Sequence, residues 1–377
     1  MKKIGVLFFF LVWGILLTSC GGKGCDLLLL NWGDYIAEEV VSAFEEEYGV
    51  KVKVSTTDSN EQMYSNIKNR TAEYDLVVPS DYMIHQMKEE NLLYKLDYTR
   101  LENYAEDMFV PQLKELMESE DCIAYQGYYI PYFWGSLGIM YNKRKPGIEE
   151  AVKEYEWSVL FEKDKLPEGS RVGMYSASRD ALAAAEMYLG YSLNTTDLTE
   201  IEASMNVLKN TDFYQWGTDD LKIDVSQGKV DVALVYSGDF FDSYYADLEA
   251  EEGVEGSSNT ENYSIYSPST HNNVFFDALV IPNTCTNLDL AYQFIDFILD
   301  YENSYTNADF IGYCPTIQSV YEEITSDTDG WGDILEIASY DPTNILNQED
   351  SWAEVYQYLG EEIYAYIEKK FTEVIFK

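Results

Sequence analysis

The sequence predicts an α/β protein made of two units. Strands and helices alternate along the first 80 residues, and a second alternation begins near residue 167. The chain has 377 residues, which is more than one small hydrophobic core accommodates. Alternating strands and helices are typical of sheets whose strands are mostly parallel. Two α/β units therefore fit both the pattern and the length.

The first unit is predicted from the spacing of its apolar residues. Residues 27–30 form a continuous apolar run, which is typical of a buried strand. Residues 36–48 place apolar side chains on one stripe of a helix, and a glycine follows them. Valines alternate with lysines over residues 50–54, as in a strand. Residues 59–69 begin with a capping box that opens a second helix, and residues 75–79 form another short buried strand.

The same reasoning assigns the rest of the chain. Residues 128–140 have strand-like character around Pro131 and Gly135. Residues 249–262 are acidic and rich in Gly, Ser and Asn, which indicates a solvated loop rather than a domain linker. The remaining predicted elements are strands at 172–175, 230–235 and 274–281, and helices at 180–189, 200–208, 288–299 and 352–371.

The N-terminus predicts an exported lipoprotein. A basic Met1-Lys2-Lys3 segment precedes an apolar run over residues 4–17, and small residues lead to Cys20. This order resembles a bacterial lipobox, so residues 1–19 are predicted to be a signal peptide and Cys20 the lipidated residue. The mature protein would then lie outside the cytoplasm, anchored to the cell membrane. An ordinary signal peptide or an N-terminal membrane helix is the alternative, although spanning a bilayer takes about 20 apolar residues.

The charge of the chain favours a cationic ligand. The formal net charge is −42 at pH 7, so nucleic acid is not an expected partner because its phosphates would be repelled. A negative field raises the local concentration of cations and speeds their capture. Acidity also serves solubility, so the charge alone does not decide the function.

Neither a metal site nor a cofactor is predicted. The five cysteines include no C-x-x-C pair, and none stands beside a histidine. The two histidines are His85, within residues 82–92 that are expected to form an exposed helix, and His271, expected in a polar loop. Neither is expected to be catalytic.

The loops that follow the predicted strands suggest a binding site. Ligands of open α/β sheets bind beyond the carboxyl ends of the strands. Most of these loops pair an aromatic residue with a carboxylate, and an organic ammonium ion needs both: a counter-charge and a flat ring face. Helix capping is the alternative role for Asp34, Ser80 and Asp239. The predicted slot has walls of Trp32, Tyr35, Tyr82, Tyr236 and Phe275, with Asp34, Asp239 and Asp277 at its ends.

These loops resemble those of the spermidine/putrescine-binding proteins of bacterial polyamine ABC transporters. The resemblance covers about residues 27–370 and rests on the order and spacing of several segments. These segments are Asn31-Trp32-Gly33-Asp34-Tyr35, residues 74–80, Ile130-Pro131-Tyr132-Phe133-Trp134-Gly135, residues 189–197, Phe275-Phe276-Asp277 and Ile311-Gly312-Tyr313.

The resemblance implies a two-lobe, periplasmic-binding-protein-like (type II) fold with mixed sheets and an interlobe hinge. The chain would change lobe near residues 134–138 and return near Asp277. Lobe 1 would comprise residues 26–136 with 278–330, and lobe 2 residues 137–277 with 331–377. Lobe closure around the ligand would be a hinge motion.

The resemblance also implies a set of ligand-binding residues. Two carboxylates of spermidine receptors would fall at Ala177 and Asp180, so one acid is missing here, and an expected glutamine could be Gln357 or Tyr356. This departure, together with Asp34 and Asp239, favours putrescine or mixed diamine specificity. The implied set is Trp32, Asp34, Tyr35, Ser80, Tyr82, Asp180, Tyr236, Asp239, Phe275, Asp277 and Tyr313.

The expected function is capture of a polyamine and its delivery to the permease subunits of an ABC transporter, by a protein that is a monomer and not an enzyme. A receptor for another organic cation, such as a choline-like ligand, is an alternative, and so is a sensing receptor that feeds no permease. A metal ion would need clustered oxygen ligands without aromatic walls. A secreted hydrolase with paired carboxylates is the remaining alternative, although no G-x-S-x-G or H-E-x-x-H motif is present.

Overall fold

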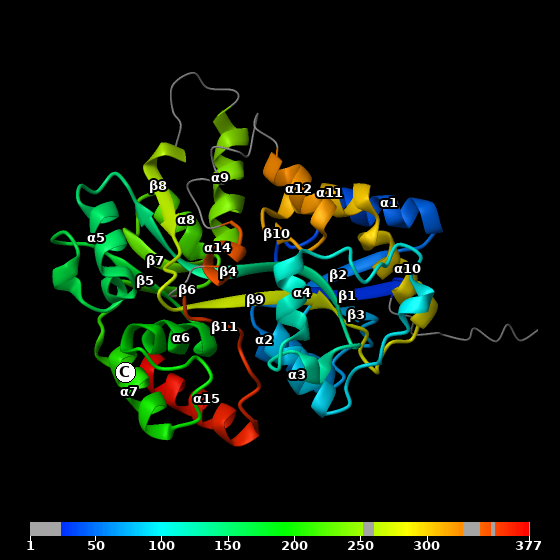
Figure 1. The fold of residues 1–377 in the computed structure, drawn as a ribbon, viewed down its shortest axis with the longest axis horizontal. Coiled ribbons are helices and arrows are strands. Elements are labelled where there is room, and N and C mark those ends of the chain that lie inside the picture. The colour runs from blue at the N-terminus through cyan, green and yellow to red at the C-terminus, as the bar shows by residue number, and fades with distance from the viewer. Residues whose placement is uncertain (1–23, 252–259, 327–339, 348–350, 377) are drawn as a thin grey trace, which may run out of the picture.

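The protein consists of two α/β lobes joined by long strands. The computed structural model describes residues 24–251, 260–326, 340–347 and 351–376. Figure 1 shows the two lobes side by side, with β4 and β9 running between them. Cys20 and its predicted lipidation lie outside the described residues. Within those residues, the helices are too short or too polar to cross a bilayer.

Lobe 1 is built on a three-stranded parallel sheet. Its strands are β1 (Leu27–Asn31), β2 (Val52–Thr56) and β3 (Leu76–Val77), in the order β2-β1-β3. The predictions for these three strands are confirmed. Because the strands are parallel, their carboxyl ends share one edge of the sheet. The helices of this lobe are α1 (Glu38–Tyr48), α2 (Asn60–Lys68), α3 (Asp81–Glu89), α4 (Pro111–Glu118), α10 (Leu288–Leu299), α11 (Tyr301–Ile311) and α12 (Gln318–Ser326).

Two strands carry the chain between the lobes. The first part of β4 (Ile130–Asn142) pairs antiparallel with β9 (Asn272–Leu279), up to Ser136 opposite Val274. From Leu137 onward β4 pairs instead with β7 (Val232–Tyr236). The change of partner falls within the predicted crossing at residues 134–138. These antiparallel pairs make the larger sheet mixed, as predicted.

Lobe 2 completes that mixed sheet. The strand order is β11-β9-β4-β7-β5-β6, with β8 (Tyr263–Tyr266) and β10 (Cys314–Pro315) also paired to β4. The C-terminal helix α15 (Glu361–Ile375) packs on α6 and α7. The other elements are β5 (Val172–Tyr175), β6 (Gln215–Gly217), β11 (Ala353–Glu354), α5 (Ile148–Tyr155), α6 (Ser178–Leu189), α7 (Leu198–Asn210), α8 (Asp220–Ser226), α9 (Ser237–Glu251) and α14 (Thr343–Leu346).

Two local predictions are wrong. The helix expected over residues 352–371 begins only at Glu361, because Ala353 and Glu354 pair with β9 as a short parallel strand. The helix around His85 is mostly buried rather than exposed, since Met83, Ile84 and Met87 pack into the core. His271 lies in a bend before β9, as expected for a loop residue, but its side chain is buried and its Nε2 lies 2.9 Å from Glu354 Oε2. Residues 252–259 of the expected acidic loop are not described.

Candidate ligand-binding cleft

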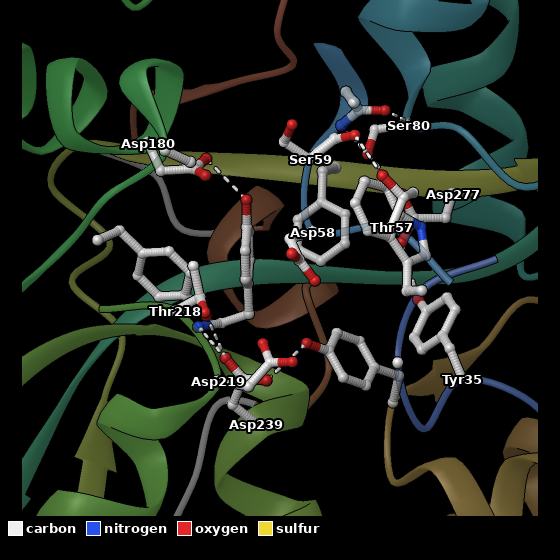
Figure 2. Close-up of a pocket in the computed structure, with 18 of the residues that line it drawn as sticks. Tyr35, Thr57, Asp58, Ser59, Ser80, Asp180, Thr218, Asp219, Asp239 and Asp277 are labelled. Atoms are coloured by element: carbon white, nitrogen blue, oxygen red, sulfur yellow. Dashed lines mark hydrogen bonds between the residues drawn. The ribbon is translucent and has the colours of Figure 1, made fainter. Parts of the chain in front are cut away.

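One cavity lies between the lobes at the carboxyl ends of the strands. Its volume is about 1070 Å³ counted out to its open mouth, and residues from both lobes line it. Figure 2 shows its labelled carboxylates directed inward from several elements. The structure brings all of the predicted site residues to this cavity: Trp32, Asp34, Tyr35, Ser80, Tyr82, Asp180, Tyr236, Asp239, Phe275, Asp277 and Tyr313.

Asp277, on β9, is a buried carboxylate held only by neutral groups. Its side chain accepts hydrogen bonds from the Tyr35 hydroxyl at 2.9 Å and from Ser80 Oγ at 2.6 Å. Asn60 donates to Ser80 Oγ at 2.9 Å, which orients that hydroxyl. Burial raises the pKa of Asp277 to about 6, although both hydrogen bonds oppose the rise. No lysine or arginine of the described residues lies within ion-pairing distance of Asp277.

Asp180, in the first turn of α6, is also a buried carboxylate that is hydrogen-bonded to neutral groups. It accepts hydrogen bonds from the Tyr236 hydroxyl at 2.7 Å and from the Tyr356 hydroxyl at 3.3 Å. Burial raises the pKa of Asp180 to about 6, and the nearby Glu61 adds to the rise. Arg179 lowers the pKa of Asp180. Its guanidinium group lies over the Tyr356 ring and forms no ion pair with Asp180. The cavity thus contains two buried carboxylates without a salt bridge among the residues described.

Asp239, near the start of α9, is surrounded by donors. The Tyr175 hydroxyl donates to it at 2.8 Å, the Tyr313 hydroxyl at 3.1 Å and the Tyr236 backbone N–H at 3.1 Å. The ammonium group of Lys222 lies 3.6 Å from its Oδ1. Asp239 therefore differs from Asp277 and Asp180, because the protein itself supplies a positive charge to it.

Aromatic rings form the walls between these carboxylates. The rings pack edge to face, and the ring centroids of Tyr236 and Phe275 are 5.0 Å apart. Those of Tyr35 and Tyr313 are 5.1 Å apart. Trp32 is half-buried, and its indole N–H is a buried donor without a partner in the described structure. Such walls offer ring faces and edges to a ligand while the carboxylates meet its charge.

The structure excludes helix capping as the role of two side chains, those of Asp34 and Ser80. Helix α1 begins after Ala37, so Asp34 is not its N-cap; Asp34 is exposed at the cavity and has a positive φ of 48°. Ser80 stands at the N-cap position of α3, but its hydroxyl makes no cap hydrogen bond and donates to Asp277 instead. Tyr82, in the first turn of α3, directs its hydroxyl to Glu61 Oε1 at 2.9 Å.

Several lining residues were not predicted from the sequence. Lys222 and Asp219 follow β6, a three-residue strand that was not recognised, although the loop after it obeys the same carboxyl-end rule. Tyr175 is the last residue of β5, and Glu61 lies in the first turn of α2. Of the two alternatives near the C-terminus, Tyr356 lines the cavity and Gln357 does not.

The fold and the cleft define a two-lobed, type II periplasmic-binding-protein-like receptor. The family model for bacterial extracellular solute-binding proteins matches residues 39–331, and the chain belongs to that family. The predicted family and fold class are confirmed.

The chain is also similar to individual proteins whose names state a ligand. The chain is 29% identical to the putrescine-binding periplasmic protein SpuD of Pseudomonas aeruginosa, over 72% of this chain and 73% of that protein. It is 28% identical to the spermidine/putrescine-binding periplasmic protein of Escherichia coli, over 76% of each. The solved structure of the spermidine/putrescine ABC transporter substrate-binding protein PotD from Streptococcus pneumoniae is 29% identical, with a TM-score of 0.68 over 93% of this chain and 98% of that one.

Proposed function

We propose that this protein captures a linear polyamine, putrescine or spermidine, in the interlobe cleft and delivers it to the permease of an ABC transporter. One observation carries the proposal. Asp277 and Asp180 are buried carboxylates without a salt bridge among the described residues, and they face one aromatic-lined cavity. The names of the relatives support the same ligand class.

The need to compensate buried negative charge favours a cationic ligand. A buried carboxylate without a counter-charge costs several kcal/mol, and an ammonium group of a ligand would remove that cost. The tyrosine and serine hydroxyls already bound to Asp277 fix its orientation without neutralising it. Such a carboxylate is prepared for a cation that arrives from outside.

The placement of the carboxylates on different sides of the cavity favours a ligand with two charges. Asp180 and Asp277 lie at opposite sides of the cavity in Figure 2, and Asp239 at a third corner. A monoamine could neutralise only one of the two uncompensated groups. A flexible diamine could reach both while its methylene chain runs along the rings, where each cation–π contact contributes about 0.5–2 kcal/mol.

Calorimetric titration of the purified protein with putrescine, spermidine and choline tests this proposal. We expect both polyamines to bind with dissociation constants of about 10 μM or lower, and choline at least about 100-fold more weakly. Tight choline binding, or no binding of either polyamine, would refute it.

We further propose that Cys20 carries a lipid anchor and that the lobes comprise residues 26–136 with 278–330 and 137–277 with 331–377. The change of strand partner at Ser136 and Leu137, and the packing of α15 on α6 and α7, support these boundaries. Replacing Cys20 by alanine is expected to release the protein from membranes, which fractionation of cells would measure. Retention in the membrane fraction would contradict the anchor.

A further inference from the structure

We infer that Lys222 acts as a built-in ammonium group that occupies Asp239 and thereby sets which polyamine the cleft accepts, an inference that rests on the proposed function. Lys222 projects from α8 and is the one lysine or arginine among the described residues that line the cavity. No pattern in the sequence singles out Lys222.

The contacts of Lys222 fix its ammonium group in place. Its Nζ lies 2.6 Å from Asp242 Oδ2 and 3.6 Å from Asp239 Oδ1, and only 12% of its side chain is exposed. Burial by itself would lower the pKa of Lys222, but Asp239 and Asp242 outweigh burial and raise it. Lys222 is therefore charged at every physiological pH.

The consequence is an asymmetry among the three buried carboxylates. Asp239 has an internal cation and three further donors, whereas Asp277 and Asp180 have only neutral hydroxyl donors. Two carboxylates thus remain for a ligand. A diamine has one ammonium group for each of them.

A triamine has a third ammonium group, for which the cavity offers one more buried carboxylate, Asp239. The ammonium group of Lys222 already lies beside Asp239, and a second ammonium group at the same carboxylate would be repelled by it. The third ammonium of a triamine must then remain near the acidic mouth or displace Lys222. Lys222 therefore favours diamines over triamines at this site.

Titration of Lys222→Met with putrescine and spermidine tests this inference. We expect the ratio of the two affinities to shift toward spermidine by at least about tenfold, because Asp239 becomes available to the third ammonium. Lys229→Met is the matched control, since Lys229 is 60% exposed and paired with Asp224 outside the cavity. It should leave the ratio unchanged, and an equal shift in both variants would overturn the inference.

A second substitution tests whether Lys222 acts through Asp239. Adding Asp239→Asn to Lys222→Met removes the freed carboxylate, so the gain for spermidine should disappear. A gain that persists in the double variant would overturn the role of Asp239. An unchanged ratio in Lys222→Met would show that Lys222 only ties α8 to α9. Absence of any polyamine binding by the unaltered protein would instead refute the proposed function.

A measurement on the unaltered protein covers the case in which Lys222→Met does not fold. In a crystal structure with spermidine, Lys222 should keep its contacts with Asp239 and Asp242, and no ligand nitrogen should contact Asp239. A spermidine nitrogen on Asp239, with Lys222 displaced, would overturn the inference.

Discussion

Replacing Asp277 by asparagine should weaken ligand binding and, at the same time, stabilise the ligand-free protein. The substitution preserves the size of the side chain and removes its charge. Tyr35 and Ser80 can still hydrogen-bond to an amide, because a hydroxyl both donates and accepts. The two effects have one cause, since the carboxylate that a ligand would neutralise is unfavourable when the cleft is empty.

The size of the stabilisation follows from the pKa. Burial raises the pKa of Asp277 from 3.8 to about 6, which corresponds to at most about 3 kcal/mol against folding at neutral pH. Because the folded-state pKa is the higher one, the folded protein binds the proton more tightly. The cost is therefore present above pH about 6 and is lost as the pH falls toward about 4.

Urea denaturation of the ligand-free protein measures this effect. At pH about 7.5 we expect Asp277→Asn to raise the free energy of unfolding by about 1–3 kcal/mol, and the gain to vanish near pH 4. Putrescine affinity should fall by at least about 100-fold. Asp107→Asn, at an exposed carboxylate outside the cleft, should change neither quantity. A destabilised Asp277→Asn protein, or one with unchanged putrescine affinity, would refute the reasoning.

Three other predictions follow from the same cleft. Between pH about 7.5 and 5, protonation of Asp277 and of Asp180 should each lower the polyamine affinity by about tenfold, because both have a pKa of about 6. An affinity that stays constant over this range in calorimetric titrations would contradict this. Trp32→Ala should weaken polyamine binding by at least about tenfold through loss of ring contact, and an effect under about twofold would reject the contact. Gly238→Ala should also weaken binding, since a Cβ there would lie 2.0 Å from the Tyr313 ring and displace its hydroxyl from Asp239; unchanged affinity would contradict this.

The sequence predicts the lining of the cavity well where a residue directly follows a strand. Trp32 and Tyr236 lie at or just beyond strand ends that apolar runs mark clearly, whereas Asp277 lies within β9. Parallel strands bring such ends to one edge, so local pattern and fold class together suffice for them. The family resemblance then adds residues such as Tyr313, which no local pattern singles out.

The rest of the site depends on packing between distant elements. Lys222 reaches Asp239 only because α8 packs against α9, and no local pattern encodes that contact. The predicted start of the last helix is wrong for a similar reason, because Ala353 and Glu354 form a strand only by pairing with β9. The family resemblance located Asp180 as a site residue. Only the structure shows that its carboxylate is buried and has no counter-charge among the described residues.

A crystal structure of the protein with putrescine would test the central claim most directly. We expect one ammonium group within about 3 Å of Asp277 and the other within about 3 Å of Asp180, with the carbon chain against the aromatic rings. Putrescine bound elsewhere on the surface, or held in the cleft without contact to either carboxylate, would contradict it.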